Sequence, residues 1–203
     1  MDTNFEEVFD LAVSNGFLTS EAAAGGVQHS LGFLAGVPIP LPTDIAVDLG
    51  SGGGLPGLVL AAKTSCRWYL VDRSERRCSF LEWAIGVLGL SGRTEVVHSD
   101  VVRAVRGELR SRANLVTARG FGSPGVTAEC AVGFLAIDGK LVISEPPNEF
   151  ETRWATGPLR KLGFVNFGSW RYEGSGFFAV RLVEEVSPGI PRSWRTITRS
   201  PMF

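Results

Sequence analysis

The amino-acid sequence predicts an α/β fold, with a mainly parallel sheet covered by helices. From residue 45 onward, short apolar runs alternate with longer amphipathic ones, which is typical of parallel strands joined by crossover helices. A dense cluster of glycines follows the first apolar run. Only Glu173-Gly174-Ser175-Gly176 separates the last two runs, and this hairpin spacing predicts that the final strand of the chain is antiparallel.

The first 36 residues are expected to form a short helical cap. Apolar residues recur there at helical spacing, at Phe5, Val8, Phe9 and Ala12. Thr19-Ser20-Glu21 offers a cap for a second short helix, and a stretch rich in Gly and Pro at 36–42 then breaks the pattern. We therefore expect two units, a helical cap at 1–36 and a core domain at 43–203.

The core domain is expected to hold seven strands, at residues 45–49, 68–71, 95–98, 115–117, 140–144, 165–172 and 177–183. Helices are expected between them, at 56–63, 74–88, 101–110, 123–135 and 149–161. A final antiparallel strand on an otherwise parallel sheet is the arrangement of Rossmann-like class I methyltransferases. Fold alone, however, establishes no activity.

Composition excludes several other classes of protein. The chain has 203 residues, 44% of them hydrophobic and 20% charged, which suits a single globular domain. No apolar run approaches the roughly 20 residues that cross a bilayer, and the acidic start lacks the basic flank of a signal peptide, so we expect a cytoplasmic protein. The cysteines Cys66, Cys78 and Cys130 lack metal-ligand spacing, which predicts reduced thiols and no metal site.

Charge is distributed unevenly along the chain. The first 62 residues hold seven acidic residues and no lysine or arginine, so all 20 basic side chains lie beyond them. A polyanionic partner would therefore be met by the later part of the chain, unless the arginines only form solvated helix faces.

The first strand-to-helix turn carries the clearest chemical signal, Asp48-Leu49-Gly50-Ser51-Gly52-Gly53-Gly54. Glycine lets the backbone turn sharply and lets a ligand approach the main chain. In open α/β sheets such a ligand lies across the carboxyl ends of the strands, beside the helix N-terminus. Gly50, Gly52 and Gly54 are therefore candidate cofactor-binding residues.

Two cofactors compete for this turn. Residues 52–57 satisfy the G-x-G-x-x-G pattern of dinucleotide-binding proteins. The pattern Asp48-x-Gly50-x-Gly52-x-Gly54 is a longer match, and a carboxylate at the end of the strand accepts hydrogen bonds from the amino group of a methionine moiety, whereas it would repel a pyrophosphate. Asp48 thus favours S-adenosylmethionine over a nicotinamide dinucleotide.

Two further acidic residues follow the next two predicted strands. Asp72 ends the second strand, where a carboxylate accepts hydrogen bonds from both ribose hydroxyls. It could also cap the helix that begins near Ser74, and the two roles are compatible. Asp100 follows the third strand, at the height expected for the adenine ring, or serves there as a helix cap.

These motifs resemble those of the bacterial 16S ribosomal RNA guanine-N7 methyltransferases, the RsmG or glucose-inhibited division protein B family. The resemblance runs through residues 48–57, which end in Leu55-Pro56-Gly57, through residues 70–81, and through residues 116–121 with Ala118-Arg119-Gly120-Phe121. It implies methyl transfer from S-adenosylmethionine to N7 of a guanine, with ribosomal RNA or the small ribosomal subunit as partner.

The resemblance also implies roles for single residues. Gly50 and Leu55 match positions that contact the cofactor, and Asp72 matches the ribose-binding acid. Arg119 matches an arginine beside the methyl-transfer site, which makes it the catalytic candidate and a cofactor-binding one. Asp100-Val101-Val102 stand where the family usually has Arg-Ala-Glu, and we expect their backbone to contact adenine.

The chain departs from the family pattern in ways that affect substrate choice. Glu145-Pro146-Pro147 follow the fifth strand, where the family commonly has Lys-Gly, so an anion replaces a cation where RNA would approach. His29-Ser30-Leu31 stand where the family tends to have Asp-Ser-Leu. Two alternatives therefore stay open: a methyltransferase of the same fold with another RNA or small-molecule substrate, and a catalytically silent cofactor-binding homologue.

Neither histidine stands in a catalytic pattern, and His29 and His98 are expected to be structural. Guanine N7 carries a lone pair and no proton, so its methylation needs positioning and desolvation rather than a general base. The tail at 191–199 mixes arginines with Trp194, which is the composition of a nucleic-acid-contacting segment or of a frayed terminus.

Overall fold

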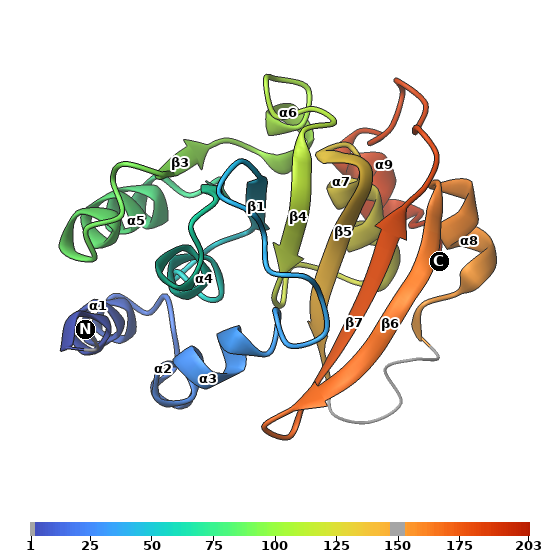
Figure 1. The fold of residues 1–203 in the computed structure, drawn as a ribbon. Coiled ribbons are helices and arrows are strands. Elements are labelled where there is room, and N and C mark those ends of the chain that lie inside the picture. The colour runs from blue at the N-terminus through green and yellow to red at the C-terminus, as the bar shows by residue number, and fades with distance from the viewer. Residues whose placement is uncertain (1–2, 147–152) are drawn as a thin grey trace.

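Seven strands form one sheet in the computed structural model, which describes residues 3–146 and 153–203 (Figure 1). The strand order is β3-β2-β1-β4-β5-β7-β6. The strands are β1 (Ile45–Leu49), β2 (Arg67–Asp72), β3 (Thr94–His98), β4 (Ala113–Ala118), β5 (Leu135–Glu145), β6 (Phe164–Tyr172) and β7 (Ser175–Leu182). The first five run parallel, and β7 is antiparallel to both β5 and β6, as the short link before it predicted.

Helices cover both faces of the sheet, because each buried strand presents apolar side chains to both sides. One face is covered by α4 (Gly57–Lys63) and α5 (Glu75–Val87), whose buried side chains join the cluster around Trp68 and Leu70. The other face is covered by α6 (Val101–Ala104), α7 (Pro124–Val132), α8 (Thr156–Lys161) and α9 (Trp194–Arg199), which pack on the cluster around Val47 and Val116. The predicted Rossmann-like α/β class is confirmed.

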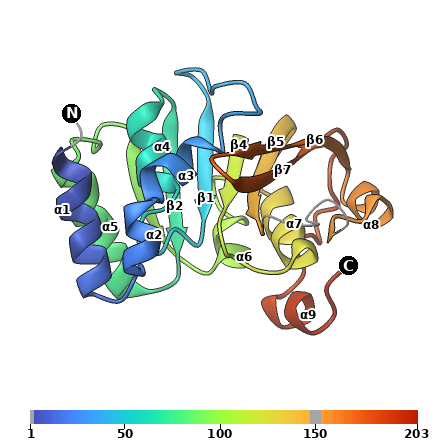
Figure 2. The same ribbon diagram turned by 90° about the horizontal axis from the view of Figure 1, so that it is seen from below.

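Three helices precede the sheet: α1 (Thr3–Ser14), α2 (Ser20–Ala24) and α3 (Gly26–Leu31). Two had been expected, and the second is divided at Gly25. Phe5 and Phe9 of α1 are buried in the same apolar cluster as α5, and the two helices lie side by side (Figure 2). The helical segment thus shares a core with the sheet, while the division into units 1–36 and 43–203 stays a prediction.

Several predicted boundaries are wrong for identifiable reasons. The helix expected at 101–110 ends at Ala104 and continues as turns, although Val105 and Leu109 are still buried. Strand β5 begins at Leu135, where a helix was expected to end, because Leu135 pairs with Ala113 of β4. Of the helix expected at 149–161, residues 149–152 lie outside the described residues, and the described part is α8.

The C-terminal helix α9 was not predicted. Ser193 caps it by accepting a hydrogen bond from the Thr196 amide, and the helix buries its own Ile197 fully in the core. The interpretation of this segment as a frayed terminus is therefore wrong. Within residues 3–146 and 153–203, no helix is long and apolar enough to cross a membrane.

Candidate functional site

The turn after β1 is held open by glycine conformations. Gly50, Gly52 and Gly54 have φ values of +67°, +53° and +92°, a region that other residues rarely adopt. The amides of Gly50 and Ser51 donate to the carbonyl of Val71, at 2.9 and 3.1 Å, so the loop is tied to the end of β2. An added Cβ on Gly50 would lie 2.9 Å from the ring of Phe121, and glycine thus also keeps space beside that ring.

Asp72 links this loop to the next turn. Its Oδ2 accepts a hydrogen bond from the Gly52 amide at 2.9 Å, and its Oδ1 accepts one from the Ser74 amide at 2.9 Å. The guanidinium of Arg77 lies 3.9 Å from Oδ2. A carboxylate offers about four lone-pair sites, so both oxygens can accept further hydrogen bonds. Asp72 is therefore a rigidly held acceptor. The N-cap residue of α5 is Ser74, and Asp72 binds the Ser74 amide without being the cap itself.

A cavity of about 350 Å³ opens at the carboxyl ends of β1, β2 and β3, and we call it the glycine-loop cavity. Its wall consists of Gly50, residues 71–74, Arg77, residues 99–101, Gly120, Phe121 and Trp194. Four of the predicted cofactor-binding residues thus meet on one wall: Gly50, Asp72, Asp100 and Val101. The position matches the crevice in which open α/β sheets bind ligands.

Other predicted cofactor-binding residues lie behind this wall. Leu55 is buried and packs on Gly26 of α3, where an added Cβ would lie 2.7 Å from a Leu55 methyl group. Gly54 packs on Leu58, and Val102 is buried in the core beneath α6. Gly52 acts through its amide on Asp72. The two glycines and Leu55 shape the loop, Val102 belongs to the core, and none of the four lines the glycine-loop cavity.

Asp100 serves as a helix cap, one of the two roles considered for it. Its Oδ1 accepts a hydrogen bond from the Val102 amide at 2.9 Å, while the residue also lines the cavity. As with Asp72, capping leaves acceptor capacity for a ligand.

Asp48 is almost fully buried, with 1% of its surface exposed, and it lines neither of the cavities described here. Thr117 on the neighbouring strand donates to Oδ1 at 2.7 Å, whereas Oδ2 is buried without a hydrogen-bond partner among the described residues. Burial raises the pKa of Asp48 to about 6, while Thr117, Ser51, the nearby Gly57 backbone and the charge of Arg119 lower it. A buried carboxylate with one unsatisfied oxygen therefore lies beneath the loop.

A second cavity, of about 530 Å³, lies between the N-terminal helices and the turn that joins β6 to β7. This N-terminal cavity is lined by Thr19, Glu21, Ala22, Gly25, Gln28, His29, Arg119, Glu173 and Ser175. The Trp170 side chain donates to the carbonyl of Gly32 at 2.8 Å and so fastens β6 to the end of α3. Arg119 faces this cavity, while its neighbours Gly120 and Phe121 face the glycine-loop cavity.

Arg119 is half-buried and has no hydrogen bond or ion pair with any residue in the described ranges 3–146 and 153–203. Burial lowers its pKa, and the charge of Asp48 raises it. Burial and the charge of Arg119 lower the pKa of His29 to about 4, so His29 is neutral near pH 7. The Nδ1 atom of His29 is buried without a partner among the described residues. Among the described residues, the cavity thus holds one buried polar atom without a partner, beside a cation without one.

The expected anion at the end of β5 does not face solvent. The side chain of Glu145 is 4% exposed and is paired with Arg153, while Trp154 donates to its Oε1 at 3.1 Å. Glu145 is therefore neutralised inside the protein, which corrects the expectation that it would meet RNA. Pro146 is exposed, and Pro147 lies outside the described residues.

Sequence patterns missed two aromatic residues of the glycine-loop cavity, Phe121 and Trp194. Phe121 stands beside the quoted Arg119-Gly120 pair, a local signal that could have identified it. Trp194 lies more than 70 residues further along the chain, and no local pattern connects it to the cavity.

The cysteine side chains agree with the prediction of reduced thiols. All three cysteines are buried and free, and burial raises the pKa of Cys78 to about 11 and of Cys130 to about 12, so both are protonated thiols. No group of three potential metal ligands occurs in the part of the chain that the structure describes.

Comparisons of the sequence with a family model and with curated proteins return the same family. The family model of rRNA small subunit methyltransferase G matches residues 28–146. A curated protein of that name from Caldicellulosiruptor bescii is 26% identical over 166 residues, covering 78% of this chain and 70% of the relative. Another, from Rubrobacter xylanophilus, is 36% identical over 119 residues, covering 57% of this chain and 45% of the relative. The chain thus spans less than half the length of the second relative.

Solved structures show the same fold. TYW2 from P. horikoshii in complex with MeSAdo superposes with a TM-score of 0.61 at 14% identity, over 81% of this chain and 64% of that one. An RNA methyltransferase from Salinibacter ruber in complex with S-adenosyl-L-homocysteine gives 0.56 at 17% identity, over 80% and 93%. With the family model covering more than half of the sequence, the chain belongs to the rRNA small subunit methyltransferase G family.

Proposed function

We propose that this chain transfers a methyl group from S-adenosylmethionine to N7 of a guanine in 16S ribosomal RNA. Family membership makes it a methyltransferase that uses this cofactor, and the guanine and its atom are the finer part of the proposal. The observation that carries the proposal is the glycine-loop cavity with Asp72 on its wall. A cytoplasmic location, where ribosomal RNA is found, belongs to the same proposal.

The cavity wall fits the nucleoside part of the cofactor. Asp72 keeps lone pairs for the two ribose hydroxyls, and Asp100 and Val101 lie at the end of the next strand, where the adenine ring would be held. Gly50 lets the ligand approach the main chain without a side chain between them.

The methionine part would lie toward Asp48 and Arg119. Their opposite charges suit the amino and carboxylate groups of an amino acid, with the buried Asp48 acting electrostatically from beneath the loop. This arrangement supports S-adenosylmethionine over a pyrophosphate-containing dinucleotide, which Asp48 would repel. The cofactor supplies an electrophilic methyl group.

The N-terminal cavity is the proposed place for the substrate base. Arg119 can donate to O6 of guanine, and because N7 must keep its lone pair for the methyl group, this arginine should donate to O6 and leave N7 free. The attack removes no proton from N7, so the neutral His29 is not needed as a base. The residues of this site would position the base and exclude water.

The ribosomal partner is supported by the distribution of charge. All basic residues lie after residue 62, and the buried, paired Glu145 presents no anion to an approaching phosphate. The N-terminal helices remain without lysine or arginine, so we expect RNA to approach from the strand-end side that carries Arg73 and Arg77.

Mapping of the methylated nucleotide tests the proposal. Small ribosomal subunits that lack the modification are incubated with the protein and labelled cofactor, and the modified position is located by chemical cleavage at N7-methylguanine. Transfer to one guanine of 16S RNA is expected, with none to total metabolites. Transfer only to another RNA or to a small molecule would replace the substrate, and cofactor binding without any transfer would identify a silent homologue.

A further inference from the structure

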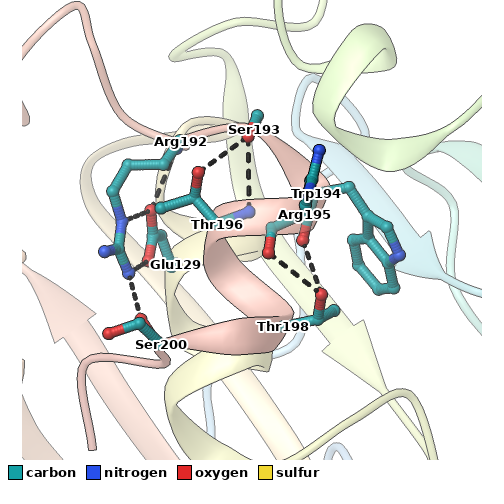
Figure 3. A network of polar contacts seen from close by, with 8 residues as sticks. All are labelled: Glu129, Arg192, Ser193, Trp194, Arg195, Thr196, Thr198 and Ser200. Atoms are coloured by element: carbon teal, nitrogen blue, oxygen red, sulfur yellow. Dashed lines mark hydrogen bonds and ion pairs between the residues drawn. The ribbon is translucent and has the colours of Figure 1, made fainter.

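The C-terminal segment from Ile190 to Phe203 is fastened to the core by a buried ion pair (Figure 3). Glu129 of α7 is 0% exposed, and Arg192 donates to it through Nε at 2.7 Å and through Nη2 at 2.6 Å. The Arg192 amide adds a third hydrogen bond to Oε1 at 2.9 Å. Paired hydrogen bonds of this kind fix both the position and the orientation of an arginine.

Other contacts fix the short helix that follows. The Nη2 atom of Arg192 also donates to the carbonyl of Ser200 at 3.1 Å, so one guanidinium spans both ends of α9 (Figure 3). Ser193 caps the helix, and Ile197 is buried in the core. Beyond the helix, the backbone of Phe203 lies so close to Gly125 that an added Cβ there would be 2.5 Å from it.

This docking places Trp194 at the glycine-loop cavity. Figure 3 shows its indole on the side of α9 away from Arg192. The ring lies 6.2 Å from that of Phe121, at an interplanar angle of 72°, and both residues line the cavity. Asp72 and Asp100 line the same cavity from the ends of β2 and β3. Aromatic side chains beside oxygen acceptors suit a planar base that is joined to a ribose.

We propose that Trp194 forms an aromatic wall against the adenine ring of the cofactor, and that Glu129 and Arg192 position it. The inference rests on the proposed cofactor and extends the site beyond residues 28–146, the part that the family model matches. Trp194 is half-buried at a cavity that already holds the ribose-binding candidate, and this favours the cofactor over RNA as its ligand.

Calorimetry with S-adenosylhomocysteine and Trp194 variants tests the contact. Trp194→Ala should weaken binding about tenfold, equivalent to about 1.4 kcal/mol, with a melting temperature close to that of the parent. Trp194→Phe should bind within about threefold of the parent, because a benzene ring still stacks on adenine.

Fluorescence gives a readout that a purely structural role would not change. Binding of S-adenosylhomocysteine should quench tryptophan emission in the parent, and Trp194→Phe should lose most of this quenching while it still binds. The matched control is Trp83→Phe, because Trp83 is also partly exposed and lines a different cavity on α5, and it should keep the quenching.

The role of the ion pair is tested by combining variants. Glu129→Gln should weaken cofactor binding in the parent but add little in the Trp194→Ala background, although it should lower the melting temperature in both. Asp138→Asn, which removes the exposed ion pair with Arg181, should leave cofactor binding unchanged. Additive effects of Glu129→Gln and Trp194→Ala would show that the ion pair does not act through Trp194.

The outcomes separate this inference from the proposed function. If the parent binds S-adenosylhomocysteine and Trp194→Ala binds it equally well, the wall is wrong and the cofactor assignment stands. Weaker RNA binding by Trp194→Ala with unchanged cofactor binding would likewise overturn the inference and assign Trp194 to the substrate. Failure of the parent to bind S-adenosylhomocysteine would overturn both.

Discussion

The two cavities differ in how far their polar groups are already satisfied. In the glycine-loop cavity, both oxygens of Asp72 accept main-chain hydrogen bonds, and Asp100 is engaged with the Val102 amide. In the N-terminal cavity, Arg119 has no partner within the described residues, and Nδ1 of His29 is buried without one. The first site is preorganised by the protein alone, whereas the second holds groups whose partners are expected to arrive with a ligand.

The cavities also differ in the segments that build them. All residues of the glycine-loop cavity except Trp194 lie within residues 28–146, the part that matches the family model. The N-terminal cavity takes Thr19, Glu21, Ala22 and Gly25 from before this range and Glu173 and Ser175 from after it. Under the proposed assignment, the cofactor cavity is built almost entirely from the part that matches the family model, whereas the proposed substrate cavity also takes residues from outside it.

Asp72→Ala should have the largest effect on the cofactor side. Loss of the carboxylate removes the ribose acceptor and frees the Gly52 and Ser74 amides, so binding of S-adenosylhomocysteine should weaken by about 1 to 3 kcal/mol. Calorimetry measures the affinity, and circular dichroism checks that the fold is intact. If the variant binds like the parent, Asp72 only shapes the loop, and the first cavity loses its proposed role.

Arg119→Ala should act mainly on the substrate side. Methyl transfer should fall at least tenfold, or about 1.4 kcal/mol of transition-state stabilisation, with little change in melting temperature because Arg119 has no partner among the described residues. Lysine should rescue only in part, since it lacks the planar two-pronged donor geometry.

The Arg119 experiment also tests whether the two cavities bind separate ligands. If cofactor affinity falls as much as methyl transfer, Arg119 serves the cofactor carboxylate and the two cavities form one site. Transfer at the parental rate would remove Arg119 from the active site altogether.

Asp48 lies buried beneath the glycine loop and lines neither cavity, so its contribution is tested through the pH dependence of cofactor binding. Because burial raises its pKa to about 6, the carboxyl is mostly protonated at pH 5 and mostly ionised at pH 7. A cationic amino group binds better to the ionised form, so cofactor affinity should rise about tenfold or less between these pH values, with proton release. Calorimetry in buffers of different ionisation enthalpy measures both, and Asp48→Asn should bind more weakly at pH 7 and lose this dependence.

The positions of the strands along the chain could be predicted, because buried parallel strands are apolar runs bounded by turn residues. All seven were expected in place, and β1 has the predicted bounds of 45–49. The start of β5 could not be predicted, because residues 137 and 138 are exposed and Asp138 has a φ of +67°. Pairing with Ala113 of β4, a contact distant in sequence, makes this segment a strand.

The acidic residues of the candidate site could also be predicted from the sequence, since Asp72 and Asp100 follow apolar runs that end at one edge of the sheet. Trp194 was not visible, because its position depends on the ion pair between Arg192 and Glu129, which are 63 residues apart in the chain. The burial of Glu145 could not be predicted either, because its partners Arg153 and Trp154 lie eight and nine residues later and no sequence pattern pairs them with it. Local sequence patterns thus locate the strand ends. Ion pairs, which no local pattern reveals, determine whether Trp194 lies at the cavity and whether Glu145 is buried.

His29→Phe should have the smallest effect, and it tests whether the His29 ring in the N-terminal cavity is packed and desolvated. The His29 ring already lies 5.8 Å from the Phe33 ring and 5.4 Å from the Phe177 ring, so a phenyl group finds apolar neighbours. It also removes a buried nitrogen without a partner, and the free energy of unfolding at pH 7.5 should change by less than about 1 kcal/mol.

The pH dependence of that difference isolates the histidine. The pKa of His29 is about 4 in the folded protein, below its ordinary 6.5, so the unfolded chain binds more protons between these values and stability contributed by the neutral ring is lost as the pH falls. Asp48 acts with the opposite sign over a similar range, since its raised pKa favours the folded state at low pH, but it is present in both proteins and cancels in the comparison. Urea unfolding at pH 7.5 and pH 5 should therefore show His29→Phe gaining stability relative to the parent as the pH falls. An unchanged difference would mean that the ring is as free to take up a proton as in the unfolded chain, and that the N-terminal cavity is an open surface rather than a desolvated site.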